Sequence, residues 1–252
     1  MQMRAKRRDR ASATGLELFL YERAFADCLE RVSHVQRQFR RALLIGSPDP
    51  HWPRRLEELA EEVEVRDPAP RVAQEAGGEV LVEDAWAPEQ ARYDLVLAIG
   101  TLDTVNQLPL ALRLVRHALA PGGLFLGALP GGETLPQLRR AMRAADAVSG
   151  GAAPHVHPRI EASALGPLLA AAGFVDPVVD VDRVQVSYAS LDRLVGDLRA
   201  MAATNLMTER SRFVGRAGRL AAIEAFAAAG DGTRTVEQFE ILHFAAWTPS
   251  EG

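Results

Sequence analysis

The chain has 252 residues, of which 48% are hydrophobic and 25% charged, with a formal net charge of -4. This is the composition of an ordinary soluble globular protein, and its mildly acidic balance argues against a nucleic-acid-binding protein. The single cysteine, Cys28, excludes an internal disulfide framework and any cysteine-based metal cluster. It suits a reducing compartment, so a cytoplasmic location is expected. No apolar run approaches the roughly 20 residues of a transmembrane helix.

The N-terminal region begins with a strongly basic segment, Met1 to Arg10, that has no apolar core and so does not resemble a secretory signal. We predict a disordered basic arm over residues 1–15, with peripheral contact to an anionic surface as the alternative. Residues 16–39 then carry apolar side chains at helical spacing, which predicts a long amphipathic helix covering one side of the domain. Cys28 lies on its apolar side, so a buried thiol is expected.

Strands and helices alternate five times over the next ninety residues. Strands are expected at 42–45, 63–65, 80–82, 93–99 and 124–129, with helices after the first, second and fourth of them. The near-continuous apolar run of 93–99 is typical of a strand buried on both faces of a parallel sheet. The pattern predicts an α/β fold with a doubly wound, Rossmann-like parallel sheet. Such a sheet has a ligand-binding crevice at the carboxyl ends of its strands.

The pattern changes after Leu129. Helices are expected at 131–148, 163–172, 190–201 and 209–229, and strands at 174–180, 183–188 and 235–247. There is neither an internal repeat nor a low-complexity linker. We therefore expect one domain over 16–252, with a lid or helical insertion at roughly 131–160 and 189–230.

The first strand ends in a turn, Gly46-Ser-Pro-Asp-Pro50, which stands where nucleotide-like cofactors bind in α/β proteins. Such turns use glycine to bring backbone N–H groups close to the ligand. Here Pro48 and Pro50 each lack an N–H and have φ fixed near -65°. The position is right for a cofactor, whereas the chemistry of the turn is not.

Together with the order of elements, Leu119-Ala-Pro-Gly-Gly-Leu-Phe125 resembles the class I S-adenosylmethionine-dependent methyltransferases. That resemblance implies the sheet order 3-2-1-4-5-7-6, with the last strand antiparallel. Motifs in the second half resemble one branch of this family: Gly131-Gly-Glu-Thr-Leu135, Pro154-His155, Leu165-Gly-Pro-Leu-Leu169, Ala172-Gly-Phe174, Val184-Gln-Val-Ser-Tyr188 and Asp197-Leu-Arg-Ala-Met201 followed by Asn205. The branch comprises the mitochondrial complex I assembly factor 5, an arginine hydroxylase with a methyltransferase fold, and its bacterial homologues. The malonyl-carrier-protein methyltransferase of biotin synthesis is a more distant relative.

The resemblance implies S-adenosyl-L-methionine as the cofactor, held by an acidic residue and a Gly-x-Gly-x-Gly turn after strand one. In this chain Leu44 stands at the acidic position, Gly46 keeps the first glycine, and Pro48 and Pro50 replace the other two. These three replacements argue against the standard mode of binding. We therefore expect the turn to make few contacts with the methionine part of the cofactor.

The other cofactor contacts that the resemblance implies lie after strands two to four. Asp67, followed by Pro68, matches the carboxylate that holds the ribose hydroxyls, although an aspartate that caps a turn is an equal alternative. Asp84-Ala85 matches the contact with the adenine amine. Trp86 forms either a ring wall or part of the core. Ile99 and Gly100 would lie under the methionine moiety, and the next residues, Leu102-Asp103-Thr104, depart from the Leu-His-Trp that the family often carries.

On the acceptor side, Glu133, His155 and Tyr188 are the candidate residues. His155 matches the Pro-His of the family, with a loop histidine bonded to backbone as the alternative. His155 and His157 provide at most two ligands, so no metal is expected. Methyl transfer from a sulfonium needs alignment and sometimes a base, so catalytic residues stay unknown from sequence.

Two functions follow. The chain is either a methyltransferase, or a hydroxylase of the same family, acting on an unknown protein or small-molecule acceptor. Alternatively, it is a non-catalytic methyltransferase-like protein that binds a partner, as an assembly factor for a respiratory complex does. A Rossmann dehydrogenase is disfavoured because no Gly-x-Gly-x-x-Gly follows strand one.

Overall fold

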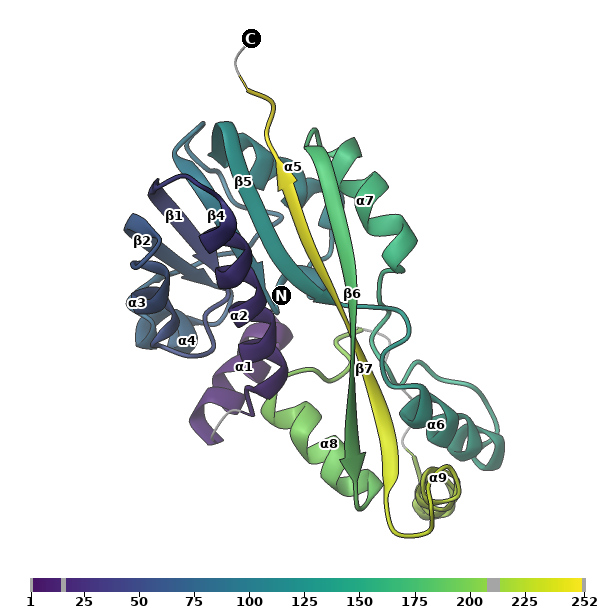
Figure 1. Ribbon diagram of the computed structural model, residues 1–252. Coiled ribbons are helices and arrows are strands. Elements are labelled where there is room, and N and C mark those ends of the chain that lie inside the picture. The colour runs from purple at the N-terminus through teal and green to yellow at the C-terminus, as the bar shows by residue number, and fades with distance from the viewer. Residues whose placement is uncertain (1, 15–16, 208–213, 251–252) are drawn as a thin grey trace.

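The computed structural model describes residues 2–14, 17–207 and 214–250. Within them, a single seven-stranded sheet has the order β3-β2-β1-β4-β5-β7-β6 (Figure 1). Its parallel part contains β1 (Phe39–Ile45), β2 (Ala60–Asp67), β3 (Glu79–Val80), β4 (Tyr93–Ile99) and β5 (Leu119–Pro130). The last strand, β7 (Thr235–Trp247), runs antiparallel to β5 and to β6 (Val175–Tyr188). This confirms the sheet order predicted from the sequence.

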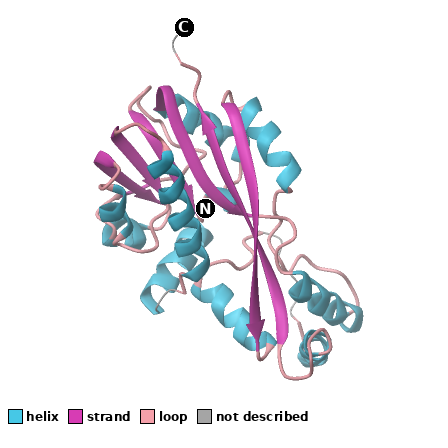
Figure 2. Ribbon diagram, in the orientation of Figure 1, coloured by secondary structure: helices cyan, strands magenta, loops and turns pink. Residues whose placement is uncertain are grey.

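Helices cover both faces of the sheet, as Figure 2 shows. One face packs against α2 (Phe19–His34) and α3 (Trp52–Leu56), where the rings of Phe25 and Trp52 stack with centroids 4.3 Å apart. The other face packs against α5 (Leu108–Ala118) and α7 (Ala162–Ala171). The central strand β4 is buried on both sides, which is why its sequence is an unbroken apolar run. Cys28 is buried as expected.

β6 and β7 continue beyond the rest of the sheet and form the base of a helical lobe with its own core (Figure 1). The lobe consists of α6 (Pro136–Ser149), α8 (Leu191–Ala200) and α9 (Arg216–Ala227). Two strands were predicted where β6 is one continuous strand, because a half-exposed edge strand can include the polar break at Asp180 and Asp182. The predicted helix 209–229 lies in part outside the described residues. The helices of the lobe fall within the predicted insertions at 131–160 and 189–230, of which residues 208–213 lie outside the described residues, and the role of the lobe as a lid stays a prediction.

The N-terminal segment was predicted to be a disordered arm, and this is wrong for the part of it that the structure describes. Residues Gln2–Thr14 form helix α1, which packs against α4 (Pro70–Glu75) and α8. The sequence suggested disorder because the segment has little apolar surface of its own. Its basic side chains pair with carboxylates 59 and 79 residues away, and no local pattern reveals such partners.

In the described part of the chain, no helix is both long and apolar enough to cross a membrane.

Candidate functional site

The carboxyl ends of β1 and β4 meet at Gly46, as the crevice of a doubly wound sheet requires. Gly46 has φ of +87°, and a Cβ atom there would lie 2.2 Å from the carbonyl oxygen of Ile99. Both the backbone conformation and the close approach of the two strands therefore need glycine. Glycine is therefore required at this first position of the turn.

The proline-containing turn after Gly46 is held by bonds to the protein itself. Ser47 donates its N–H to Asp67 Oδ2 at 3.3 Å and its hydroxyl to the carbonyl of Asp49 at 2.9 Å. The Asp49 carboxylate in turn accepts the N–H of His51 at 2.8 Å. Pro48 and Pro50 have no N–H to offer. The turn thus presents few free N–H groups, so it could make few contacts with the methionine part of a cofactor, as the sequence predicts.

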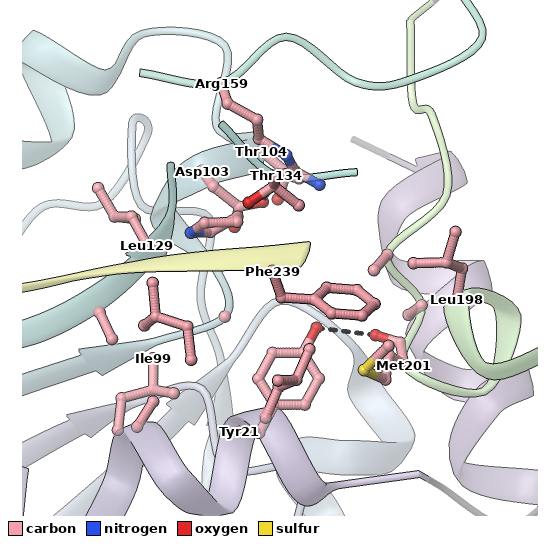
Figure 3. Close-up of a pocket in the computed structure, with 18 of the residues that line it drawn as sticks. Tyr21, Ile99, Asp103, Thr104, Leu129, Thr134, Arg159, Leu198, Met201 and Phe239 are labelled. Atoms are coloured by element: carbon pink, nitrogen blue, oxygen red, sulfur yellow. Dashed lines mark hydrogen bonds and ion pairs between the residues drawn. The ribbon is translucent and has the colours of Figure 1, made fainter. Parts of the chain in front are cut away.

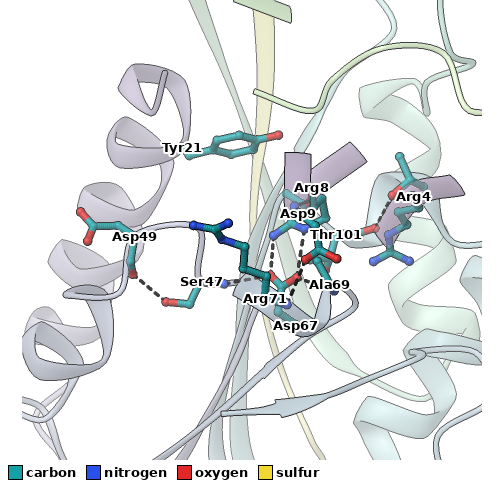
Figure 4. Close-up of polar contacts among 12 residues, drawn as sticks. Arg4, Arg8, Asp9, Tyr21, Ser47, Asp49, Asp67, Ala69, Arg71 and Thr101 are labelled. Atoms are coloured by element: carbon teal, nitrogen blue, oxygen red, sulfur yellow. Dashed lines mark hydrogen bonds and ion pairs between the residues drawn. The ribbon is translucent and has the colours of Figure 1, made fainter. Parts of the chain in front are cut away.

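Asp67 ends β2 as predicted, and its side chain is completely buried (Figure 4). Its carboxylate accepts the N–H of Ala69 at 2.9 Å as well as that of Ser47. Pro68 separates Asp67 from Ala69 along the chain. The bond from Ala69 is that of an aspartate that caps a turn, and contact of Asp67 with a ribose stays a prediction.

Two arginines of α1 reach the crevice from outside the sheet (Figure 4). Arg8 donates Nε to Asp67 Oδ1 at 3.0 Å, Nη2 to Asp67 Oδ2, and Nη1 to the carbonyl of Gly100 at 2.8 Å. Arg4 makes a similar double contact with Glu83, with Nη1 2.9 Å from Oε2. Burial by itself lowers the pKa of Arg8, but the Asp67 carboxylate outweighs it, so the pKa is raised and the ion pair stays charged.

Tyr21 of α2 covers the next part of the crevice. A Cβ atom on Gly100, whose φ is +64°, would lie 2.4 Å from Cε1 of the tyrosine ring. The phenol donates to the carbonyl of Met201 at 2.8 Å (Figure 3). Burial raises the pKa of Tyr21 to about 12, so this hydroxyl is neutral at physiological pH. Tyr21 was not a candidate from sequence, because it reads as one more residue of an amphipathic helix.

On the predicted adenine side, the carboxylates of Glu83 and Asp84 point in different directions. Glu83 is buried and faces Arg4, whereas Asp84 accepts the N–H of Gln107 at 3.1 Å. The second oxygen of Asp84, Oδ1, is buried and has no hydrogen-bond partner among the described residues. Ala85 is exposed, and Trp86 is half-buried against the core. Trp86 therefore packs on the core, and its contact with an adenine stays a prediction.

A pocket opens between α1, α2, the ends of β4 and β5, the middle of β7, and the lobe (Figure 3). Arg159 forms an ion pair with Asp103 at one end, where its side chain is 3% exposed and its Nε has no partner in the described residues. Thr134 exchanges hydrogen bonds of 3.0 Å with the backbone of Glu240. Apolar and small side chains complete the lining, among them Leu20, Ile99, Leu129, Leu198, Met201 and Phe239. This is a mostly apolar chamber whose charged lining residues include Arg4 and Arg8 of α1 besides the Arg159–Asp103 pair.

The three acceptor-side candidates lie outside the lining of this pocket. Glu133 is exposed, and Tyr188 is buried in the core of the lobe. The ring of His155 bonds Asp146 Oδ1 at 2.7 Å, so its partner is a side chain and not the backbone. Their part in binding an acceptor stays a prediction. The neighbouring Thr134 and Arg159 line the pocket instead, and Thr134 belongs to a motif that the sequence had already singled out.

The residues of the crevice that could hold S-adenosylmethionine lie at its nucleoside end. At the nucleoside end, Asp67 is a buried carboxylate held by backbone N–H groups, and Asp84 Oδ1 is a buried acceptor without a partner among the described residues. At the methionine end, the N–H groups of Ser47 and His51 are used within the protein, and Tyr21 covers Gly100. In this conformation Arg8 and Arg4 also form ion pairs with the crevice carboxylates of Asp67 and Glu83.

The comparisons with known proteins agree with this geometry. The methyltransferase domain family matches residues 18–177. The chain belongs to the class I methyltransferase family. It is 31% identical to the arginine-hydroxylase NDUFAF5 of Danio rerio over 244 residues, which are 92% of this chain and 76% of that protein, and this places it in the NDUFAF5-like branch.

A malonyl-[acyl-carrier protein] O-methyltransferase of Xylella fastidiosa is 35% identical over 165 residues, covering 64% of this chain and 53% of the relative. Among solved structures, the YcgJ protein of Bacillus subtilis superposes with a TM-score of 0.61 at 11% identity, over 92% of this chain and all of that one. That structural likeness shows the fold alone. The class I family and the branch are thus those that the sequence motifs indicated.

Proposed function

We propose that this protein binds S-adenosylmethionine through the nucleoside end of the crevice and acts on an acceptor held in the neighbouring pocket. The observation that supports this most is the Asp67 carboxylate. It ends β2, is fixed by the N–H groups of Ser47 and Ala69, and could accept hydrogen bonds from the hydroxyls of a ribose. Burying a carboxylate is costly unless it is paired with a positive group or a hydrogen-bond donor. In this structure the charged partner of Asp67 is Arg8, which comes from α1 and not from the sheet.

The pocket supports an acceptor of mixed character. Its apolar walls suit an aliphatic or aromatic portion, whereas the Arg159–Asp103 pair and the Thr134 hydroxyl lie at a polar end. Tyr21 stands between the crevice and the pocket, where it contacts Gly100 on one side and Met201 on the other. With a pKa of about 12, this phenol is a hydrogen-bond donor and not a base at neutral pH. Both methyl transfer and hydroxylation by a member of this branch are compatible with such a chamber.

A second function is favoured by a different observation. The turn at Pro48 and Pro50 is held by hydrogen bonds within the turn. The arginines of α1 form ion pairs with the two carboxylates of the crevice. A protein that kept the fold only to bind a partner, as an assembly factor does, would tolerate both features. The relative NDUFAF5 shows that this branch includes proteins named for chemistry other than methyl transfer.

Calorimetric titration distinguishes the two functions. S-adenosylmethionine and S-adenosylhomocysteine are titrated into the native protein and into a Pro48→Gly/Pro50→Gly variant, which restores two N–H groups and backbone freedom to the turn. We expect measurable binding by the native protein, and binding at least about tenfold tighter by the variant. That factor corresponds to about 1.4 kcal/mol, the order of one added hydrogen bond to a charged group. Binding by neither protein at millimolar ligand would favour the non-catalytic function.

A further inference from the structure

Helix α1 differs in charge from the rest of the molecule. Its thirteen residues, Gln2–Thr14, contain five basic side chains and one carboxylate, that of Asp9, so its formal charge is +4. The whole chain carries -4, so the remainder carries -8. A strongly cationic helix therefore docks on a strongly anionic body, and the docking is steered by opposite charge.

The contacts of α1 are concentrated on the crevice and its rim. Arg4 and Arg8 lie four residues apart, hence on one face of the helix, and bind Glu83 and Asp67. On the lobe side, Arg7 donates Nη1 to the hydroxyl of Thr204 at 2.7 Å and also to the carbonyl of Asn205. Asp9 accepts the N–H of Arg71, at the start of α4, at 3.0 Å. α1 thus bridges the sheet edge and the lobe across the crevice.

Apolar burial contributes little to this docking. Ala11 is buried, but Met3, the largest apolar side chain of α1, is 40% exposed. An isolated helix of this length is marginal in water. Formation of α1 is therefore coupled to its ion pairs with the body, and loss of those pairs would release the segment and not merely shift it.

Docked α1 occupies the carboxylate to which a ribose would bind under the proposed function. The Asp67 side chain is 0% exposed, and both of its oxygens are bonded to Arg8. A ribose hydroxyl must approach a carboxylate oxygen to roughly 2.7 Å, a position that the guanidinium occupies. Arg8 also bonds the carbonyl of Gly100, and Arg4 lies on Glu83 next to the predicted adenine contact. The guanidiniums of Arg4 and Arg8 thus occupy the nucleoside end of the crevice.

We propose that α1 is an internal inhibitor of the cofactor site, whose Arg8 and Arg4 side chains compete with the nucleoside for the carboxylates of the crevice. The protein is then in equilibrium between a closed state, with α1 docked, and an open state that binds the cofactor. The apparent affinity of the site is lowered in proportion to the fraction of molecules that are open. This inference rests on the proposed binding of S-adenosylmethionine.

The test compares two double variants of α1 that change its charge equally. Arg4→Ala/Arg8→Ala removes the two guanidiniums in the crevice, whereas Lys6→Ala/Arg10→Ala removes two positive charges whose side chains are exposed. S-adenosylhomocysteine is titrated calorimetrically into each variant and into the native protein. We expect the first variant to bind at least about tenfold more tightly than the native protein, as for a site that is open about a tenth of the time or less. The control variant should bind like the native protein.

A second readout follows α1 directly. Hydrogen exchange of the backbone amides of residues 2–14 is measured by mass spectrometry with and without saturating S-adenosylhomocysteine. Ligand should speed exchange in α1 of the native protein, because binding releases the helix. Adding Asp67→Asn to the Arg4→Ala/Arg8→Ala protein should remove binding, which would show that the ligand and Arg8 use the same carboxylate.

The outcomes separate this inference from the proposed function. Equal affinities in all three proteins, with α1 protected throughout, would overturn the inhibitory role and leave cofactor binding intact. Weaker binding by Arg4→Ala/Arg8→Ala would also overturn it, because the arginines would then hold the cofactor. Binding by none of the proteins at millimolar ligand would overturn the proposed function and the competition with it. If the double variant does not fold, Arg8→Lys, which keeps the charge but loses the bidentate fork, should likewise bind more tightly than the native protein.

Discussion

Gly46 and Asp67 show at the scale of single residues how the crevice is built. Gly46 allows β1 to end against the backbone of β4, and Asp67 is fixed beside it by two backbone N–H groups. Both were identified from the sequence, because each follows an apolar strand in the order typical of the family. The partner of Asp67, Arg8, was not, because an arginine in a basic N-terminal segment has no local feature that separates it from its neighbours.

Replacing Gly46 by alanine should cost far more stability than the same change at another left-handed glycine. The new Cβ would meet the Ile99 carbonyl at 2.2 Å, whereas at Gly232, with φ of +93°, nothing lies within 4 Å. We expect a loss of about 1 kcal/mol for Gly232→Ala, from backbone conformation alone, and of at least about 3 kcal/mol for Gly46→Ala. The free energies of unfolding come from urea denaturation. Equal losses in the two variants would contradict a close approach of β1 and β4 at this point.

At the scale of elements, the amphipathic helix and the central strand followed from periodicity. β4 and β7 begin and end where the sequence predicted. Helix α1 could not be predicted from periodicity, because its stability comes from ion pairs to distant segments and not from an apolar face. β6 is one strand and not two, since its pairing with β7 continues through Asp180 and Asp182.

The docking of α1 should therefore depend on salt, whereas that of α2 should not. α2 is held by Phe25, Cys28 and Val32, which are all buried. Raising the salt concentration from about 0.05 M to about 0.5 M shortens the screening length several-fold and weakens the attraction between α1 and the acidic body. Hydrogen exchange should speed up in residues 2–14 and stay unchanged in residues 19–34. Salt-independent protection of α1 would show that packing and not charge holds it.

At the scale of the whole molecule, all three tyrosines of the chain have raised pKa values. Burial is the main cause in each, and it raises the pKa of Tyr21 and of Tyr93 to about 12. Tyr93 also donates to Glu64 at 2.8 Å, which adds to its shift. Because the neutral phenol is favoured in the fold, this contribution to stability is complete below the unfolded pKa of about 10. It is lost as the pH rises through the folded values.

The tyrosinate absorbance of the folded protein should thus be nearly absent at about pH 10.5. In guanidinium chloride most of the phenol should be ionised at the same pH, since the unfolded pKa is about 10. A Tyr21→Phe variant should show the same delayed titration, because Tyr93 and Tyr188 are buried too. Substantial ionisation of the folded protein near pH 10 would contradict the burial of these rings.

The order of the sheet, the family and the positions of Gly46, Asp67 and Gly100 could be predicted from the sequence alone. These depend on apolar periodicity and on residues that follow strand ends, which are local properties of the chain. Only the tertiary structure decided what faces Asp67, which residues line the pocket, and that the basic N-terminal segment is a helix docked on the crevice. Those facts depend on contacts between segments tens of residues apart, where the energy lies in pairing and burial that no local window contains.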